Sequence, residues 1–313
     1  MDYVIGVDLG GTQLRAILAD PAGTIYTEIR VPTEAHRGPS AVIERIIECI
    51  VKVQAALPAD GTLLGVGIGT PGPLDPDTGV VFTTPNMPGW HRVPLRDMLI
   101  ERTGLLVELG NDANVAALGE WRFGGGAGHR HFVYITVSTG IGGGVVVDGQ
   151  VLLGRLGAGA ELGHIIINYA ERKSWEDLAS GTGLAAAAAV AMAENPTSLL
   201  HDLATPTTVT AAHVALAASR SDPPAQALMQ QEAMLLGIGF VSVLHLFSPE
   251  RIMVGGSVIT SNPYLLEDAR QVVQERAIAD VYREVPIEVA TLGDQVGVLG
   301  AVALLLYQRE KRG

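Results

Sequence analysis

Two glycine-rich segments of the chain carry residue types that suit phosphate binding. Gly10, Gly11 and Thr12 lie in VIGVDLGGTQLRAIL, and Thr139 and Gly140 lie in VYITVSTGIGGGVVV. Glycine lets backbone N–H groups approach oxygens closely, and threonine adds a hydroxyl donor. Neither segment is a Walker loop, because GxxxxGKS/T is absent and each turn leads into a strand. Either turn alone is equally compatible with a plain tight hairpin, but two related copies favour phosphate binding.

Asp8 is a carboxylate inside an otherwise apolar strand, directly before the first glycine turn. A buried carboxylate is costly unless it is paired or bound to a cation. Beside a phosphate turn we expect Asp8 to contact Mg²⁺, directly or through water. The alternative is a carboxylate that accepts hydrogen bonds from neighbouring backbone amides.

Asn111-Asp112-Ala113-Asn114 follows an apolar strand and opens a helix. Asn and Asp are favoured helix caps, so one of these residues serves capping on the simplest interpretation. A cap does not require several such residues in succession. The carboxyl end of a strand, where a helix begins, is also a usual place for ligand chemistry in α/β proteins.

Two other patterns are typical of a dinucleotide site and a di-metal site, but the residues around each pattern do not fit such a site. Gly67, Gly69 and Gly72 spell the dinucleotide fingerprint GxGxxG after a strand, but Pro71 and Pro73 stand where the required helix would open. Glu-x-x-His in GRLGAGAELGH, Glu161 to His164, occurs once and is flanked by glycines, whereas a di-metal bundle needs two helical copies.

The elements that would position these residues follow an α/β pattern. The segments around the glycine turns read as paired strands, Tyr3–Leu9 with Leu14–Asp20 and Phe132–Val137 with Val145–Asp148, which indicates an internal duplication. A third strand, Thr24–Val31, continues the first pair. Further strands are expected at Leu63–Ile68, Leu105–Leu109, Arg251–Val254 and Ile287–Thr291. Helices are expected at about Pro39–Leu57, Asp112–Phe123, Trp175–Met192, Thr210–Ser219, Ala225–His245, Pro263–Ala279 and Gly297–Gln308.

The composition excludes several classes of partner. The chain has 313 residues and a formal net charge of −12, so nucleic acid is not an expected partner. Cys49 is the only cysteine, which excludes an internal disulfide and a multi-cysteine metal site and points to a reducing compartment. No signal core precedes the first strand and no uninterrupted apolar run has membrane-spanning length, so we expect no membrane association and a cytoplasmic location.

Taken in order, these motifs resemble the ROK family (repressors, open reading frames and sugar kinases), and within it the bacterial glucokinases. The matching segments are VDLGGTQLR, TPGPLD with PNMPGW, GNDAN, VSTGIGGG, GAGAELGH, WEDLASGTGL and IMVGGSV. The resemblance implies an actin-like ATPase (ribonuclease H-like) fold in two duplicated α/β domains. We expect residues 1–112 plus 298–313 to form the first domain and 113–297 to form the second.

The resemblance also implies a division of roles among residues. Asp112 would be the catalytic base, and sugar hydroxyls would be held by Gly72, Asn111, Asp112, Glu161, His164 and Glu176, with Asn86 as a less certain contact. The ATP site would be lined by Asp8, Gly10, Gly11, Thr12, Thr139, Gly140, Gly255 and Gly256, with Mg²⁺ near Asp8. A polar set of this kind discriminates between sugars, because a missing hydroxyl leaves a buried partner unpaired.

The chain departs from the family pattern after the signature histidine His164. Relatives carry a zinc segment CxCGxxGC there, whereas this chain reads HIIINYAERKSWEDLASG. We therefore expect no zinc. Ser174 and Asp177 fit a capping box, and our hypothesis is that this cap replaces zinc in ordering the helix that presents Glu176.

The implied activity is ATP-dependent phosphorylation of a hexose, with glucose first and N-acetylmannosamine, N-acetylglucosamine, mannose or fructose as alternatives. A polyphosphate donor is less expected because no basic track is evident, and a homodimer is expected. Two rivals stay open: a sugar-sensing transcription regulator, which would need a DNA-binding module before the first motif, and an ATPase switch of the actin or chaperone kind.

Overall fold

The structure is a computed structural model that describes residues 1–84 and 87–312. Its contacts divide the chain into two compact units: Met1–Gly128 with Gln150–Ala160 and Asp294–Gly313, and His129–Gly149 with Glu161–Gly293. The division differs from the boundary expected at residue 112. Helix α3 (Asp112–Phe123) belongs to the first unit because it packs closely on α12 (Val296–Arg312), with Gly119 of α3 against Gly300 of α12.

The sheet of the first unit has the order β3-β2-β1-β4-β7. Its strands are β1 (Asp2–Leu9), β2 (Gln13–Ala19), β3 (Ile25–Pro32), β4 (Thr62–Thr70) and β7 (Val107–Asn111). The first three form an antiparallel meander, whereas β4 and β7 run parallel to β1. The meander and both later strands were predicted from the apolar pattern.

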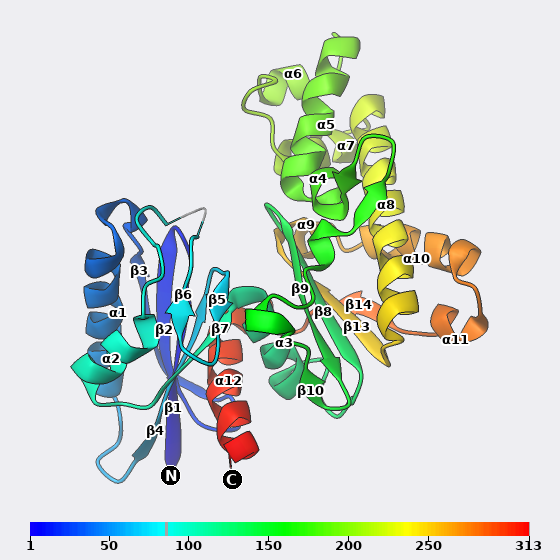
Figure 1. The fold of residues 1–313 in the computed structure, drawn as a ribbon. Coiled ribbons are helices and arrows are strands. Elements are labelled where there is room, and N and C mark those ends of the chain that lie inside the picture. Colours follow the sequence, from blue (N-terminus) through cyan, green and yellow to red (C-terminus); the bar gives the residue numbers. More distant parts are fainter. Residues whose placement is uncertain (85–86, 313) are drawn as a thin grey trace. The chain divides into compact units, whose positions relative to one another are not determined.

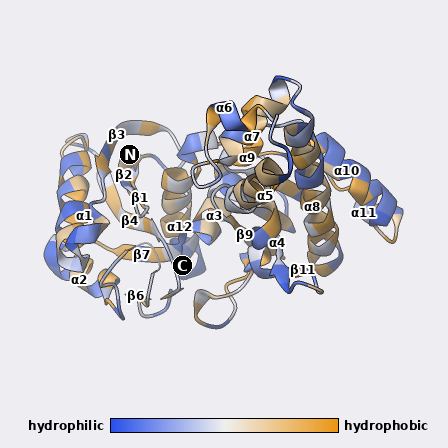
Figure 2. Ribbon diagram, turned by 90° about the horizontal axis from the view of Figure 1, so that it is seen from above, coloured by the Kyte–Doolittle hydropathy of each residue, from blue (hydrophilic) through white to orange (hydrophobic). Residues whose placement is uncertain are grey.

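Helices cover both faces of this sheet (Figure 1). Helices α1 (Pro39–Gln54) and α2 (Leu95–Thr103) lie on one face, and α3 and α12 lie on the other. Shorter elements of the unit are the strands β5 (Leu74–Asp75), β6 (Val80–Val81) and β10 (Gln150–Val151) and the 3₁₀ turns Ala35–Arg37 and Arg155–Gly157. Helix α1 carries both hydrophilic and hydrophobic colours in Figure 2, because its periodic apolar residues are buried against the sheet.

The two faces of β1 pack differently. Tyr3, Ile5, Val7 and Leu9 are buried in one core cluster with the apolar face of α1. On the other face a Cβ on Gly6 would overlap the carbonyl oxygen of Val298 in α12.

Gly67 of β4 has the same property on this face, against the carbonyl oxygen of Ala301 in α12. The apparent dinucleotide fingerprint that begins at Gly67 therefore lets a helix approach the sheet closely.

The sheet of the second unit repeats this arrangement. It contains β8 (Phe132–Val137), β9 (Ile141–Val147), β13 (Arg251–Gly255) and β14 (Ile287–Val289), in the order β9-β8-β13-β14. Strands β8 and β9 form an antiparallel hairpin, and β13 and β14 follow in parallel. The same connectivity places β2-β1-β4-β7 in the first sheet, so the chain has the expected duplicated, actin-like α/β fold.

The second unit is otherwise mainly helical. Its helices are α4 (Trp175–Ala179), α5 (Gly181–Glu194), α6 (Leu200–Leu203), α7 (Ala211–Ser219), α8 (Pro223–Phe247), α9 (Ser257–Ser261), α10 (Leu265–Arg276) and α11 (Asp280–Arg283). A small hairpin, β11 (Ile166–Asn168) with β12 (Lys173–Ser174), precedes α4, and 3₁₀ turns occur at Leu162–His164 and Gly293–Gln295.

The single helix expected at Trp175–Met192 was wrong: Ser180 ends α4 and caps α5 by accepting a hydrogen bond from Gly183 N (3.1 Å).

Helix α8 is coloured largely hydrophobic in Figure 2 and is the one described helix long and apolar enough to cross a membrane. However, 56% of its most apolar window is buried inside the structure, as in a core helix. Asp222 caps its start by accepting from Ala225 N (3.1 Å), and prolines occupy the first helical positions, where their missing N–H groups cost nothing.

Candidate functional site

The first glycine turn joins β1 to β2 and is fixed by backbone and hydroxyl contacts. Gly10 N donates to Gln13 O (2.9 Å), which closes the turn. Thr33, at the end of β3, donates from its Oγ1 to Gly10 O (2.6 Å) and from its backbone N to Thr12 O (2.9 Å). Thr12 itself is exposed and Gly11 is half-buried. The turn therefore has the rigid support and the exposed hydroxyl that a phosphate-binding turn requires.

Asp8 lies one residue before this turn, against the start of α12. A Cβ on Gly297, the second residue of that helix, would be 2.5 Å from Oδ2 of Asp8. Burial raises the pKa of Asp8, and the opposing charge of Arg15, its partner in the β1–β2 register, lowers it by less. A helix N-terminus favours a nearby negative charge. A carboxylate whose ionisation is penalised by burial gains most from a cation beside it.

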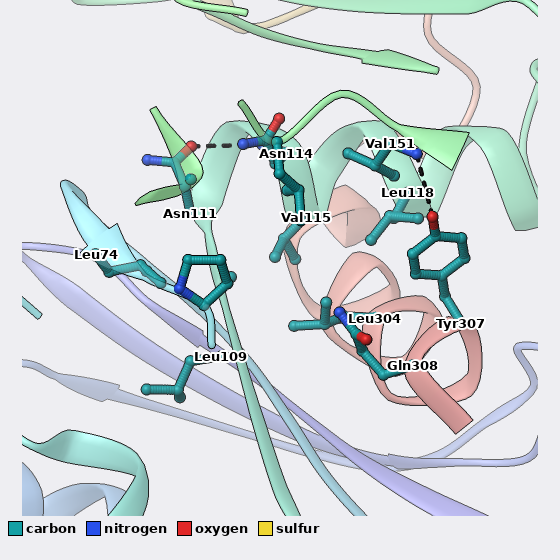
Figure 3. Close-up of a pocket in the computed structure, with 14 residues that line it drawn as sticks. Leu74, Leu109, Asn111, Asn114, Val115, Leu118, Val151, Leu304, Tyr307 and Gln308 are labelled. Atoms are coloured by element: carbon teal, nitrogen blue, oxygen red, sulfur yellow. Dashed lines mark hydrogen bonds between the residues drawn. The ribbon is translucent and has the colours of Figure 1, made fainter. Parts of the chain in front are cut away.

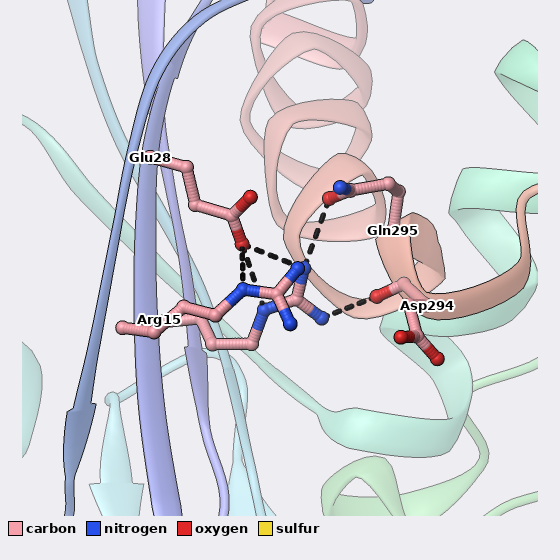
Figure 4. Close-up of polar contacts among 5 residues, drawn as sticks. Arg15, Glu28, Asp294 and Gln295 are labelled. Atoms are coloured by element: carbon pink, nitrogen blue, oxygen red, sulfur yellow. Dashed lines mark hydrogen bonds and ion pairs between the residues drawn. The ribbon is translucent and has the colours of Figure 1, made fainter.

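Arg15 fixes the same region from β2 (Figure 4). Its guanidinium donates to Glu28 Oε1 on β3 (2.8 and 3.1 Å), to Gln295 Oε1 (2.9 Å) and to the carbonyl oxygen of Asp294. Arg15 is only 7% exposed. It therefore ties the residues immediately before α12 to the strands that carry the first turn.

The second part of the first unit's site is the start of α3. Asn111 is the helix cap, and its Oδ1 accepts from Ala113 N (3.0 Å) and Asn114 N (3.4 Å). Asp112 is the first helical residue, is exposed, and accepts from Ala113 N through Oδ1 (2.8 Å). The capping role foreseen for one residue of this segment thus belongs to Asn111, and Asp112 is an exposed residue at the mouth of the helix.

Gly72 lies against the Asn111 side chain: a Cβ on this glycine would be 2.7 Å from Asn111 Nδ2. Behind Asn111 there is a small, largely apolar cavity of about 20 Å³, comparable to one water (Figure 3). It is too small for a sugar.

Asn114 also lines this cavity and is buried. Its Oδ1 has no hydrogen-bond partner among residues 1–84 and 87–312. The cavity therefore lies behind the start of α3 and does not have room for a sugar.

The second glycine turn, in the second unit, is held by the starts of helices α5 and α9. Gly181 N donates to Ser138 O (2.7 Å), and Thr182 donates to Thr139 O from its Oγ1 (2.8 Å), so the start of α5 anchors the turn. Ser257 N at the start of α9 donates to Ser138 Oγ (3.0 Å). Thr139 is exposed. Ser138, Gly181 and Thr182 were not predicted from the sequence as site residues, although the segments STG and SGTG combine the same small and hydroxyl residues as the predicted turns.

Gly255 and Gly256 join β13 to α9 beside this turn. Gly256 has a φ of 89°, a conformation that favours glycine, and a Cβ there would overlap the backbone of Val137. The two glycines therefore let the start of α9 lie directly on the end of β8. Gly256 packs on Val137 and Ser257 bonds Ser138, the two residues that precede Thr139 in the chain.

Glu176 reaches the same turn from α4. Its Oε2 accepts from the backbone N of Ile141 (2.7 Å), the first residue of β9. Gly140 is adjacent, and a Cβ there would overlap Oε2 of Glu176. Glu176 was expected on the sugar side and Gly140 on the nucleotide side, so their direct contact was not foreseen.

Glu161 and His164 also lie close to Ile141. Glu161 directly precedes the 3₁₀ segment Leu162–His164 and His164 ends it, and both residues are exposed. Gly163 between them packs on the backbone of Ile141, with the ideal Cβ 3.0 Å from the carbonyl carbon. Three expected sugar-binding residues thus gather around the start of β9. The expected contact Asn86 lies outside the described residues.

The segment between His164 and α4 ends in the predicted capping box. Asp177 N donates to Ser174 Oγ (3.1 Å), and Ser174 N donates to Asp177 Oδ2 (2.9 Å). The backbone hydrogen bond from Ser174 lowers the pKa of Asp177. Across the described chain, no group of three or more His, Cys, Asp or Glu residues is placed to hold a metal ion.

Comparisons with known proteins give a consistent result. The ROK family model matches residues 4–308. Glucokinase from Thermotoga maritima is 36% identical over 310 residues, which cover 96% of each chain. The crystal structure of a ROK family glucokinase from Streptomyces griseus with glucose and AMPPNP has a TM-score of 0.80 and 31% identity, covering 96% of this chain and 98% of that one.

A regulator is also among the relatives. The xylose repressor of Bacillus subtilis is 27% identical, and the match covers 97% of this chain but 77% of the repressor.

Proposed function

Since the chain belongs to the ROK family, we propose that it is an ATP-dependent sugar kinase that phosphorylates a hexose, with glucose as the first candidate. The proposed reaction transfers the γ-phosphoryl group of ATP to a sugar hydroxyl, the 6-hydroxyl if the sugar is glucose. N-acetylmannosamine, N-acetylglucosamine, mannose and fructose are the alternative acceptors. The similarity to glucokinases along almost the whole chain supports glucose over these.

The observation that carries the proposal is the position of Asp112. Its carboxylate is exposed at the first turn of α3, at the carboxyl end of β7, while Asn111 performs the capping. In phosphoryl transfer a protein mainly positions groups and stabilises charge, and a carboxylate that accepts the proton of the attacking hydroxyl completes the chemistry. A positioned general base contributes roughly 10²–10⁴-fold to rate.

The sugar would be recognised by the polar groups gathered around Ile141 and by the Asn111 amide. Glu161, His164 and Glu176 supply two carboxylates and an imidazole, which can accept from or donate to a ring of hydroxyls. Such a set rejects a sugar that lacks a matching hydroxyl, because the unmatched protein group loses its partner.

The phosphates of ATP would be bound by the two glycine turns, with Thr12 and Thr139 as hydroxyl donors. Gly10 and Gly11 lie in the first turn, and Gly140, Gly255 and Gly256 lie at the second. Asp8 is the residue that would hold Mg²⁺, because its half-buried carboxylate lies beside the first turn and burial penalises its ionisation. When bound, this ion would supply charge neutralisation on the phosphate oxygens. The absence of a multi-carboxylate cluster in the described chain suits an ion held mostly by phosphate and water.

The test is a coupled assay of ADP release with a panel of the five sugars. We expect turnover with at least one hexose, highest with glucose, and no release with the sugar omitted. Release of ADP at the same rate without sugar would indicate an ATPase switch instead.

A non-catalytic sugar sensor is the second candidate, and the similarity to a xylose repressor favours it. It predicts sugar binding by calorimetry with no sugar-dependent ADP release for any sugar in the panel. Binding and turnover measured on the same preparation separate the two functions.

A further inference from the structure

The contact between Glu176 and the second glycine turn links two parts of the site that were expected to serve different substrates. Ile141 N donates to Oε2 of Glu176 at 2.7 Å. Glu176 lies in the first turn of α4, which the Ser174 and Asp177 capping box fixes. The Glu176 side chain is therefore fixed at its base by α4 and at its carboxylate by the turn.

Gly140 makes this contact possible. An ideal Cβ on Gly140 would overlap Oε2 of Glu176 and lie 3.1 Å from its carboxyl carbon, but 3.7 Å from Oε1. The missing side chain of Gly140 thus faces the carboxylate rather than open solvent. Because only Oε2 is held at the turn, the other oxygen, Oε1, is the one placed to meet a substrate hydroxyl.

The same backbone supports the other expected sugar residues. The carbonyl group of Ile141 lies against Gly163, which separates Glu161 from His164 in the chain. A Cβ on Gly143 would be 2.7 Å from Leu162 Cδ1, so the apolar Leu162 side chain of the Leu162–His164 segment packs on β9. Ile141 N therefore holds the Glu176 side chain, and Ile141 C=O packs on the backbone of the segment that carries Glu161 and His164.

The chemistry of the amide favours one substrate over the other. A phosphate that approached Ile141 N would compete with a carboxylate already hydrogen-bonded there, and two anions repel at such short range. Thr139 is exposed, and Ser257 N at the start of α9 donates to Ser138 Oγ beside it. The turn thus offers an exposed threonine, while the amide of Ile141 is already engaged by a carboxylate.

We propose that Gly140 and the backbone of Ile141 are positioning elements for sugar recognition, which hold Glu176 so that Oε1 meets a hydroxyl of the hexose. The inference rests on the proposed sugar kinase function and changes the role of Gly140, which the family resemblance assigns to ATP. Gly140 acts through Glu176 and touches no reacting atom.

The decisive variant is Gly140→Ala, which adds one methyl group where the carboxylate lies. We expect the KM for glucose, or for whichever sugar of the panel is turned over best, to rise at least tenfold. The dissociation constant for AMPPNP, measured without sugar, should stay within about twofold. A merely structural defect would lower the melting temperature and weaken both ligands together.

A double-mutant cycle makes the test specific. Glu176→Ala removes the carboxylate that the added methyl group would displace. Gly140→Ala in that background should therefore leave the sugar KM unchanged relative to Glu176→Ala alone. Thr210→Ala is the comparison variant in the same unit, at the cap of α7; there we expect no change in the sugar KM.

Three results would overturn the inference while leaving the kinase function standing. These are a loss of AMPPNP affinity in Gly140→Ala as large as the loss of sugar affinity, an unchanged sugar KM, or equal effects of Gly140→Ala with and without Glu176. Should Gly140→Ala fail to fold, Glu176→Ala alone decides, because a tenfold loss of AMPPNP affinity in that variant contradicts the proposal. Failure of the kinase function itself would show as no sugar-dependent ADP release by the wild-type protein.

Discussion

The two glycine turns share a backbone plan but differ in what surrounds them. Each connects the first two antiparallel strands of a sheet whose later strands run parallel. The first turn is braced by Thr33 and follows Asp8, a half-buried carboxylate that lies against the start of a helix. The second is braced by the starts of helices α5 and α9 and holds a carboxylate, Glu176, at its own backbone amide.

The difference shows where the chemistry of a duplicated fold comes from. Strand, turn and strand supply a similar scaffold twice, and the residues that pack on each scaffold decide what it binds. Next to the first turn a lone carboxylate suits a cation; next to the second, a carboxylate, a second acid and an imidazole suit hydroxyls. In the proposed reaction, proton transfer belongs to the first unit alone, through Asp112.

The largest expected effect tests that assignment. Asp112→Asn should lower kcat by about 10²-fold or more, because it removes the general base while keeping the size of the side chain. The melting temperature should not change, since Asn111 caps the helix. Asp97→Asn alters an acidic residue in the first turn of another helix of the same unit and should leave kcat unchanged. Near-wild-type turnover of Asp112→Asn would remove this residue from the role.

The next effect concerns the stability of the first unit. Arg15→Ala should lower the free energy of unfolding by about 3 kcal/mol, because it leaves Glu28 and Gln295 without their buried partner. Arg30 contacts the same Glu28 but is 43% exposed, so Arg30→Ala should cost less than about 1 kcal/mol. Urea unfolding of both variants measures the difference, and equal losses would contradict the special role of Arg15.

The second unit carries a buried acid of its own, Glu232 on α8. It is 1% exposed, neither carboxyl oxygen has a partner among the described residues, and burial raises its pKa to about 9. The folded state therefore binds a proton that the unfolded state, with a pKa near 4.5, releases. Stability that is fully present below pH 4.5 should decline as the pH rises from there toward 9.

Glu232→Met should remove this decline and raise stability at pH 8 by about 1–3 kcal/mol, since an apolar side chain leaves no unsatisfied oxygen. Gln231→Met changes the exposed neighbour and should leave the pH dependence as in the wild type. Melting temperatures from pH 5 to 9 report both. A wild-type stability that rises over this range would refute the assignment.

The smallest effect sharpens the contrast around Glu176. Ser174→Ala should destabilise the protein by about 1 kcal/mol through loss of the cap and should also raise the sugar KM, because α4 presents Glu176. Thr210→Ala removes the other capping box of this unit and should destabilise similarly without a change in KM. Metal analysis of the purified wild type belongs to the same experiment, since stoichiometric zinc would end the idea that the cap replaces it.

Much of the fold could be predicted because local signals agreed with tertiary packing. The apolar period of α1 and the paired strands around both turns are strong patterns, and all correspond to observed elements. The division of Trp175–Met192 into two helices was missed, since Ser180 and Gly181 are weak breakers on their own. Helix α9 was not predicted, because its five residues after Gly256 are too few to show a helical period of apolar residues.

The sequence allowed the residues of the candidate site to be predicted, but not the contacts between them. Asn111 and Asp112 stand where a cap and a carboxylate at a helix mouth were expected. Glu176 and Ile141 are 35 positions apart, and no local pattern shows that one accepts a hydrogen bond from the other. The purpose of Gly67 likewise depends on α12, more than 200 residues later in the chain.

The most direct test of the account is a crystal structure of the protein with glucose and AMPPNP. It should place a sugar hydroxyl within about 3.2 Å of the Asp112 carboxylate and phosphate oxygens beside Thr12 and Thr139. It should also show Glu176 still bonded to Ile141 N. A sugar beyond reach of Asp112, or a phosphate chain away from the glycine turns, would contradict the account.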